Sequence, residues 1–219
     1  MRRHSARGVL LVAVLMLAGC AGRPPAPDWE VAAHGSLQRY QKAWLAGATR
    51  AADAEFTIAR RELAATGRAN QVARAELTRC ALRVASLDFG ACEGFEPFAA
   101  DAGDEERAYA AWLQGRALAA SEVAKLPPQH RRAAAAGPDA LAAVRAIEDP
   151  LSRLVAAGVQ VRRGLATPQM IVLGVETASG QGWRRPLLAW LGLELRLAES
   201  AGDEAVAARI RRRIELVGR

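Results

Sequence analysis

The chain has 219 residues, of which 51% are hydrophobic and 5% aromatic, and it carries a net charge of +7. This length is enough for one domain with a substantial core. Acids are interspersed with the cations, and removal of the predicted export signal described below lowers the charge to a mildly basic +4, which argues against a nucleic-acid-binding protein. Alanine, the best helix former, is the most frequent residue, and alternating runs of Val, Ile and Thr are nearly absent, so we expect an all-α fold.

The first nineteen residues have the pattern of an export signal. Arg2, Arg3 and Arg7 precede an uncharged run over 8–19. As a helix this run would reach roughly 18 Å, against a hydrocarbon core of about 30 Å, so it is too short to span a bilayer. A charged start, a short apolar stretch and then small residues are typical of a signal peptide that is removed.

The end of this run carries the most specific motif in the chain. Leu17-Ala18-Gly19-Cys20 resembles the bacterial lipobox. The resemblance implies that the Cys20 sulfur receives a diacylglycerol, that the bond before it is cut, and that the new amino terminus is acylated, for example with palmitate. The alternative is that Cys20 is an ordinary buried thiol at the end of a hydrophobic helix. Ala21, rather than Asp, resembles the enterobacterial sorting signal for the outer membrane.

The residues after Cys20 are rich in proline and glycine, as in Ala21-Gly22-Arg23-Pro24-Pro25-Ala26-Pro27. Such a stretch cannot form a helix or a central strand, so we expect a short tether over 20–28. Cleavage before Cys20 leaves 200 residues and removes three arginines, which lowers the net charge to +4. We therefore expect a single all-α domain over 29–219, anchored to a membrane by lipid and facing the periplasm.

Apolar residues recur at helical spacing through the whole of this domain. Asp149-Pro150 and Thr167-Pro168 place a capping side chain before a proline, as at a helix start. Gly47, Gly67, Gly164 and Gly202 lie where helices should end. The pattern predicts eight helices in antiparallel hairpins, the fourth ended by Pro127-Pro128 and the last broken near Gly202: 29–47, 50–65, 69–87, 104–125, 138–147, 150–163, 167–178 and 186–217.

Two cysteines, Cys80 and Cys92, remain after cleavage. In an exported protein an even number of cysteines predicts a disulfide, which here would add about 3 kcal/mol in the loop-entropy description. Their spacing lacks the ligand pattern of a zinc site, and the chain has no Cys-x-x-Cys redox motif.

The segment 88–98, DFGACEGFEPF, breaks the helical pattern. It holds Cys92 and three of the four phenylalanines of the chain. One interpretation is a loop, stapled by the disulfide, that tucks its Phe side chains between helices. The other is an apolar lip that recognises a partner. The sequence leaves both open.

Ala-Trp-Leu occurs three times, at 43–45, 111–113 and 189–191. Together with Leu191-Gly192 and small residues about ten positions later, this weakly resembles the helical hairpins of tetratricopeptide repeats. The resemblance implies a solenoid of hairpins. An irregular helical bundle, in which each Trp fills its own core, is the alternative.

The mature sequence holds no recognisable catalytic or metal-binding motif. His34 and His130 lie in different predicted segments, so each is expected at the surface or at a helix cap, and no cofactor is expected. Arg211, Arg212 and Arg213 are candidates for anion binding. We expect a non-enzymatic scaffold that binds other envelope proteins. The alternative is a protein that binds an anionic glycan or lipid through an arginine-rich face, and a cell-wall enzyme is a third. The oligomeric state stays open.

Overall fold

The computed structural model describes residues 26–218, so the predicted signal, Cys20 and most of the predicted tether lie outside the described residues. Within this range the chain forms α-helices and two short 3-10 helices without a β-strand, which confirms the all-α prediction. The helices are α2 (Asp28–Leu45), α3 (Thr49–Ala64), α4 (Ala69–Ala85), η2 (Glu96–Phe98), α5 (Asp104–Leu113), α6 (Ala120–Val123), α7 (Pro128–Ala135), η3 (Gly137–Asp139), α8 (Leu141–Arg145), α9 (Pro150–Arg162), α10 (Pro168–Gly180), α11 (Arg184–Ser200) and α12 (Glu204–Gly218).

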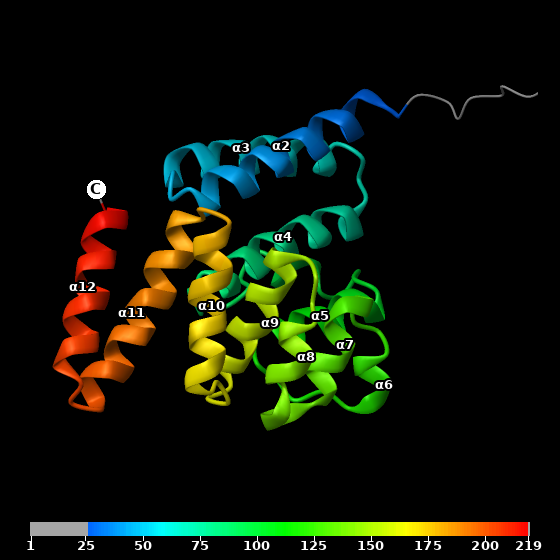
Figure 1. Ribbon diagram of the computed structural model, residues 1–219. Coiled ribbons are helices and arrows are strands. Elements are labelled where there is room, and N and C mark those ends of the chain that lie inside the picture. The colour runs from blue at the N-terminus through cyan, green and yellow to red at the C-terminus, as the bar shows by residue number, and fades with distance from the viewer. Residues whose placement is uncertain (1–25, 219) are drawn as a thin grey trace, which may run out of the picture.

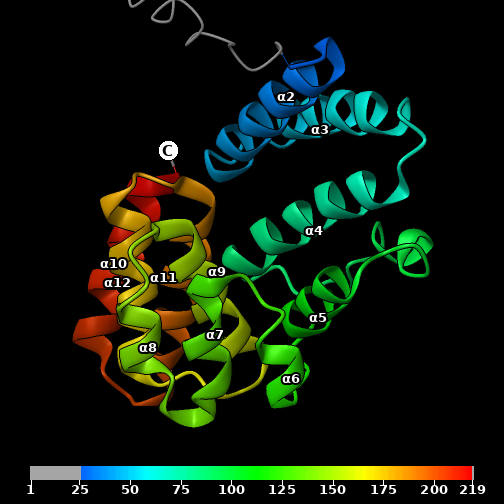
Figure 2. The same cartoon turned by 90° about the vertical axis from the view of Figure 1, so that its right-hand side faces the viewer.

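Helix α4 lies at the centre of the arrangement. It contacts α2, α3, α5 and α9, while α9, α10, α11 and α12 pack against one another in chain order. Figure 1 shows these last helices side by side, with the α2–α3 hairpin across their upper end. In Figure 2 the short helices α5 to α8 lie below α4, whereas the α2–α3 hairpin lies above it. Antiparallel hairpins therefore build the fold, as the short connections predict.

The α2–α3 hairpin has a small core of its own. Tyr40, Trp44 and Phe56 pack there with Val72 and Leu82, which come from one face of α4. The remaining helices share a second, larger core to which α4 contributes its other faces. Since α4 belongs to both cores, it joins the hairpin to the rest of the domain.

Two of the three repeated tryptophans bind the same end of α4. Trp44 Nε1 donates to the Leu82 carbonyl at 3.2 Å, and Trp190 Nε1 donates to the Ala85 carbonyl at 3.0 Å. Carbonyls in the last turn of a helix often lack a partner within the helix, so Trp190 satisfies an Ala85 carbonyl that would otherwise be buried and unpaired. The Leu82 carbonyl also accepts hydrogen bonds from the Ser86 backbone N–H and hydroxyl, so Trp44 is an additional donor to it. Trp112 is also buried, but it packs against His130 instead, with ring centroids 4.6 Å apart and the rings tilted by 39°.

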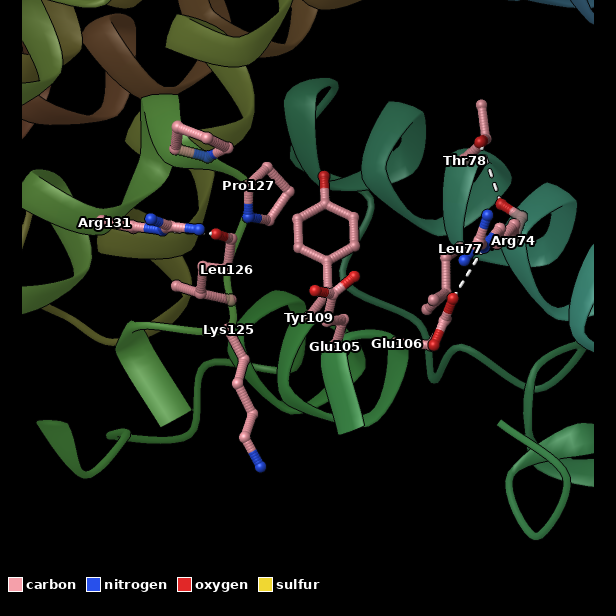
Figure 3. Close-up of a pocket in the computed structure, with 11 residues that line it drawn as sticks. Arg74, Leu77, Thr78, Glu105, Glu106, Tyr109, Lys125, Leu126, Pro127 and Arg131 are labelled. Atoms are coloured by element: carbon pink, nitrogen blue, oxygen red, sulfur yellow. Dashed lines mark hydrogen bonds and ion pairs between the residues drawn. The ribbon is translucent and has the colours of Figure 1, made fainter. Parts of the chain in front are cut away.

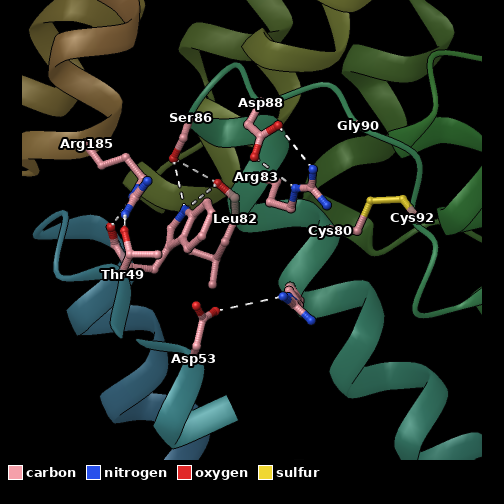
Figure 4. Close-up of polar contacts among 12 residues, drawn as sticks. Thr49, Asp53, Cys80, Leu82, Arg83, Ser86, Asp88, Gly90, Cys92 and Arg185 are labelled. Atoms are coloured by element: carbon pink, nitrogen blue, oxygen red, sulfur yellow. Dashed lines mark hydrogen bonds and ion pairs between the residues drawn. A yellow bond between two sulfur atoms is a disulfide. The ribbon is translucent and has the colours of Figure 1, made fainter. Parts of the chain in front are cut away.

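Arg185 clamps the hairpin to the start of α11 (Figure 4). Its Nε donates to the Trp44 carbonyl at 2.8 Å and its Nη2 donates to the Thr49 hydroxyl at 2.6 Å. The guanidinium also lies over the Trp44 ring, 4.1 Å from its centroid. One side chain thus holds both arms of the hairpin through hydrogen bonds and a cation–π contact.

Most of the predicted helix starts and ends agree with the structure. Asp149 and Thr167 accept hydrogen bonds from the backbone of Ser152 and Met170 and cap α9 and α10. The predicted stop glycines 47, 67, 164 and 202 all have positive φ angles, and Gly202 separates α11 from α12 as expected. Helix α11 begins two residues before the predicted start at Pro186.

Two predicted helices are wrong. The helix expected over 104–125 ends at Leu113, because Gly115 turns the chain with φ +84°, and only the single turn α6 follows. Pro128 does not end that helix but starts another, α7, which we did not expect; proline fits the first turn because no intrahelical donor is needed there. The helix expected over 138–147 is reduced to η3 and the short α8.

Between residues 26 and 218, no helix combines the length and the apolar character that crossing a membrane requires.

Candidate functional site

A cleft of about 360 Å³ opens between α4, α5 and the segment that leads into α7. This volume is in the range of sites that take a small ligand or one side chain of a partner. We call it the α4–α5 cleft. It is lined by Arg74, Leu77, Thr78, Glu105, Glu106, Tyr109, Lys125, Leu126, Pro127, Pro128 and Arg131.

Tyr109 lies in the middle of the cleft. Its ring stands between Pro127 on one side and Leu77 and Thr78 on the other (Figure 3). Burial raises the pKa of the Tyr109 hydroxyl above its ordinary value, so the phenol is neutral at physiological pH. The centre of the cleft is therefore apolar, with one neutral hydroxyl that can donate or accept a hydrogen bond.

Charged groups surround this apolar centre, and most of them are already paired. Arg74 Nε donates to Glu106 Oε1 at 2.6 Å. Burial raises the pKa of Glu106, but the hydrogen bonds that it accepts, led by that from Arg74, outweigh burial and hold the pKa below its usual value. Lys125 is paired with Asp104, and Arg131 Nε donates to the Leu126 carbonyl at 2.7 Å. Because these pairs hold the rim in place, the cleft has a preformed shape.

Behind the cleft, Tyr109 belongs to a buried aromatic stack. Its ring lies 5.9 Å from both Trp112 and His130 and is nearly parallel to His130, at 18°. Burial lowers the pKa of His130 to about 4, although Asp149 acts in the opposite direction. The imidazole is thus neutral at physiological pH. The stack fixes the orientation of Tyr109 from inside the protein.

The structure differs from the sequence prediction for one histidine. His34 is exposed and lies 2.9 Å from Gln38, as expected for a surface residue. His130 is not at the surface: it is only 2% exposed. Among residues 26–218, no group of three or more His, Cys, Asp or Glu side chains is placed to hold a metal ion.

Cys80 and Cys92 form the predicted disulfide, with Cα atoms 5.4 Å apart. It ties α4 to the 88–98 loop (Figure 4). Phe95 is buried, and Phe89 and Phe98 pack partly buried against the main core. This arrangement favours the stapled loop over the apolar lip.

The three arginines proposed for anion binding lie on α12. Arg211 pairs with Glu199 at 2.6 Å and with Glu204 at 3.6 Å, and Arg213 lies 3.7 Å from Glu194. Arg212 is exposed. The cluster is therefore partly neutralised by acids of α11 and α12.

The sequence did not reveal the α4–α5 cleft. Arg74 and Glu106 meet across 32 positions of sequence. Pro127-Pro128 stood out in the sequence only as the end of a predicted helix. Tyr109 lies in the helix predicted over 104–125 and is half-buried, and nothing in its local sequence marked it as the centre of a cleft.

No family model, curated protein or solved structure matches this chain.

Proposed function

We propose that the chain is a lipoprotein of a bacterial envelope whose helical domain is a non-enzymatic scaffold for another envelope protein. The lipobox-like Leu17-Ala18-Gly19-Cys20 supports a lipid anchor at Cys20. Several acyl chains hold a protein firmly at a bilayer, whereas one holds it marginally. In this proposal the domain faces the periplasm, and Ala21 directs it to the outer membrane.

The observation that carries the binding role is the α4–α5 cleft with Tyr109 at its centre. Interface energy concentrates where a few side chains fill a desolvated pocket inside a polar rim. The cleft has this design: apolar walls from Leu77, Leu126 and Pro127, and a charged rim. An apolar side chain of a partner fits its centre, and charged groups beside that side chain fit the rim.

Two further features support a scaffold rather than an enzyme. The rim charges are held in ion pairs such as Arg74–Glu106, which leaves them poorly disposed to transfer protons to a substrate. The antiparallel hairpins and the repeated Ala-Trp-Leu support a tetratricopeptide-like mode of binding, in which a partner lies between helices.

Photocrosslinking in intact cells tests this proposal. A photoreactive amino acid at Thr78, inside the cleft, is expected to give one defined adduct with an envelope protein. A photoreactive group at Arg196, on α11, is the control and is expected not to give it. Tyr109→Leu, which removes the ring and the hydroxyl from the centre, and Glu105→Arg, which changes only the rim, are both expected to reduce the adduct. An adduct that persists in both variants, or no adduct at Thr78, would refute the cleft as the binding site.

The anchor is tested separately. We expect the wild-type chain in the membrane fraction, with an acylated Cys20 as its first residue by mass spectrometry. Cys20→Ser is expected to abolish acylation and leave the uncleaved signal in place. An intact chain that begins at Met1 with an unmodified thiol would contradict the lipoprotein assignment without affecting the argument for the cleft.

A further inference from the structure

A second concave surface lies on the opposite side of α4. It is a groove of about 860 Å³ between α3 and α4, and we call it the α3–α4 groove. Its lining consists of Phe56, Thr57, Arg60, Arg61, Ala64, Ala65, Glu76 and Arg79. It shares no lining residue with the α4–α5 cleft, so it is a separate site.

The groove has an apolar floor and basic sides. The exposed Ala64 and Ala65 supply most of the floor, whereas Phe56 is only 3% exposed and contributes little. Three arginines and one glutamate supply its charged groups, and they come from both helices. An occupant with an apolar stripe and acidic flanks would therefore match the groove in both respects.

Aromatic rings hold two of these arginines in place. The Arg79 guanidinium lies 4.9 Å from the centroid of Phe56, and that of Arg60 lies 5.7 Å from the centroid of Phe98. Such cation–π contacts reduce the number of conformations of long side chains. The basic sides of the groove are thus preorganised, which lowers the entropy that binding would cost.

The arginine charges are only partly neutralised. Arg60 pairs with the buried Glu76 at 3.0 Å. Arg79 is 3.9 Å from Asp53, at the limit of an ion pair, and Arg61, which is 71% exposed, pairs with its neighbour Glu62 at 2.9 Å. Exposed ion pairs of this kind contribute little, so Arg61 on α3 and Arg79 on α4 can exchange these acids for the carboxylates of a partner on the two sides of the groove.

The dimensions favour a helix as the occupant. At 1.5 Å per residue, the groove extends about 13 Å along α3, from Phe56 to Ala65. A smaller hollow beside the disulfide shares Glu76 and Arg79 and continues to Arg83, which gives about 10 Å along α4. Two to three turns of helix have this length. A compact anion such as a phosphate would need the guanidinium groups to converge, whereas here they are spread along two helices.

We propose that the α3–α4 groove binds an acidic amphipathic helix of a partner protein. Its apolar residues, spaced three and four apart, pack on Ala64 and Ala65, and its carboxylates pair with Arg61 and Arg79. This surface is independent of the α4–α5 cleft and of the lipid anchor, so the scaffold has two binding surfaces on opposite sides of one helix.

A library of displayed helical peptides, selected on the purified full-length chain, tests this inference. We expect the enriched peptides to carry net negative charge and apolar residues at spacings of three and four. Peptides that bind in the α4–α5 cleft are recognised because Tyr109→Leu weakens them. The affinity of the remaining peptides should fall steeply with added salt, because exposed charges are screened.

Variants locate the binding. Arg61→Glu combined with Arg79→Gln should weaken the selected peptides by at least about tenfold. Arg212→Glu on α12 is the matched control and should change their affinity less than about twofold, since exposed charges far from an interface contribute little. Unchanged thermal unfolding of the variants would show that they are folded.

Four outcomes overturn the proposal. They are no enrichment, enrichment of neutral or basic peptides, equal binding by the Arg61→Glu, Arg79→Gln variant, and displacement of the peptides by phosphatidylglycerol vesicles but not by phosphatidylcholine vesicles. The last outcome would assign the groove to anionic lipid instead.

Discussion

His130 is a titratable side chain that the fold keeps neutral. It is buried between Tyr109 and Trp112, and its Nδ1 has no hydrogen-bond partner among the described residues. Burial lowers its pKa from 6.5 to about 4. The unfolded chain therefore binds a proton at a higher pH than the folded chain does.

This difference predicts a loss of stability in mild acid. As pH falls below 6.5, His130 becomes protonated in the unfolded state, whereas in the folded state it stays neutral down to about pH 4. The free energy of unfolding should decrease by about 1.4 kcal/mol per pH unit in this window, or about 3 kcal/mol in total, and the His130 contribution should be constant above it. Urea unfolding at several pH values measures it. His130→Phe keeps a ring in the stack and should lack this part of the decrease; equal pH profiles for both proteins would contradict the assignment.

The three buried tryptophans allow a second test at the residue scale. Trp190 and Trp112 are both at most 1% exposed. Trp190 Nε1 donates to the Ala85 carbonyl, whereas Trp112 Nε1 has no partner in the described part of the chain. The same substitution should therefore have different effects at the two positions.

We expect Trp190→Phe to lower the free energy of unfolding by about 1–2 kcal/mol more than Trp112→Phe, because it leaves a buried carbonyl unpaired. Both variants remove the same volume, so each is the control for the other. Denaturant unfolding of the two variants measures the difference. Equal losses would show that the Ala85 carbonyl finds another partner.

At the scale of the elements, glycines determine how closely two pairs of helices pack. A Cβ at Gly158 of α9 would lie 2.3 Å from the Val84 carbonyl oxygen of α4. A Cβ at Gly174 of α10 would lie 2.3 Å from the ring of Trp190 in α11. Helix α9 thus approaches α4, and α10 approaches α11, at distances that only glycine permits.

Gly158→Ala should lower the free energy of unfolding by about 3 kcal/mol, since backbone atoms of two helices must separate. Gly180, at the end of α10, is the matched control, because a Cβ there meets nothing within 4 Å. Gly180→Ala should be neutral or stabilising by up to about 1 kcal/mol, from helix propensity alone. Thermal or urea unfolding compares the two; a small loss for Gly158→Ala would mean that α9 can shift away from α4.

Whether a helix boundary could be predicted from the sequence depends on whether local residues or tertiary contacts determine it. Caps and stops such as Asp149 and Gly202 act locally, so they are readable from neighbouring residues. Gly115 ends α5, yet nothing in its local sequence distinguishes it from a glycine tolerated inside a helix. Pro127-Pro128 can end one helix or begin another, and the choice depends on packing of His130 and Ala133 into the core.

The cleft and the groove could not be predicted for a related reason. Each is lined by helices whose spacing is set by tertiary contacts: Arg74 with Glu106 for the cleft, and Arg79 with Phe56 for the groove. The sequence shows these residues as ordinary solvent-facing charges or core positions. Only the crossing of α3, α4 and α5 brings them together.

For the molecule as a whole, α4 contributes to the cleft, to the groove and to the packing of α2 and α11. Its Arg74, Leu77 and Thr78 line the cleft, and its Glu76 and Arg79 line the groove. Its last turn accepts the hydrogen bonds of Trp44 from α2 and of Trp190 from α11. The α3–α4 groove therefore depends on how the α2–α3 hairpin is held against α4, whereas the α4–α5 cleft has no lining residue from that hairpin.

In addition to the small core, the side chain of Arg185 holds the α2–α3 hairpin to α11. Its Nε and Nη2 bind the Trp44 carbonyl and the Thr49 hydroxyl, and its plane covers the Trp44 ring. Lysine lacks the planar fork and cannot make this set of contacts. The hairpin has a separate core, so its loss of contacts should appear as local opening rather than global unfolding.

We therefore expect Arg185→Lys to accelerate amide hydrogen exchange in α2 and α3 by roughly thirtyfold, which corresponds to about 2 kcal/mol of local stability. Exchange in α9 and α10 should stay unchanged, because these helices belong to the larger core. Arg184→Lys is the control, since the neighbouring Arg184 binds the Gly218 carbonyl of α12 and does not contact the hairpin. Mass spectrometry of exchanged peptides resolves the segments. If exchange rises equally in all helices, the domain unfolds as one unit, and the groove between α3 and α4 cannot open independently of the cleft.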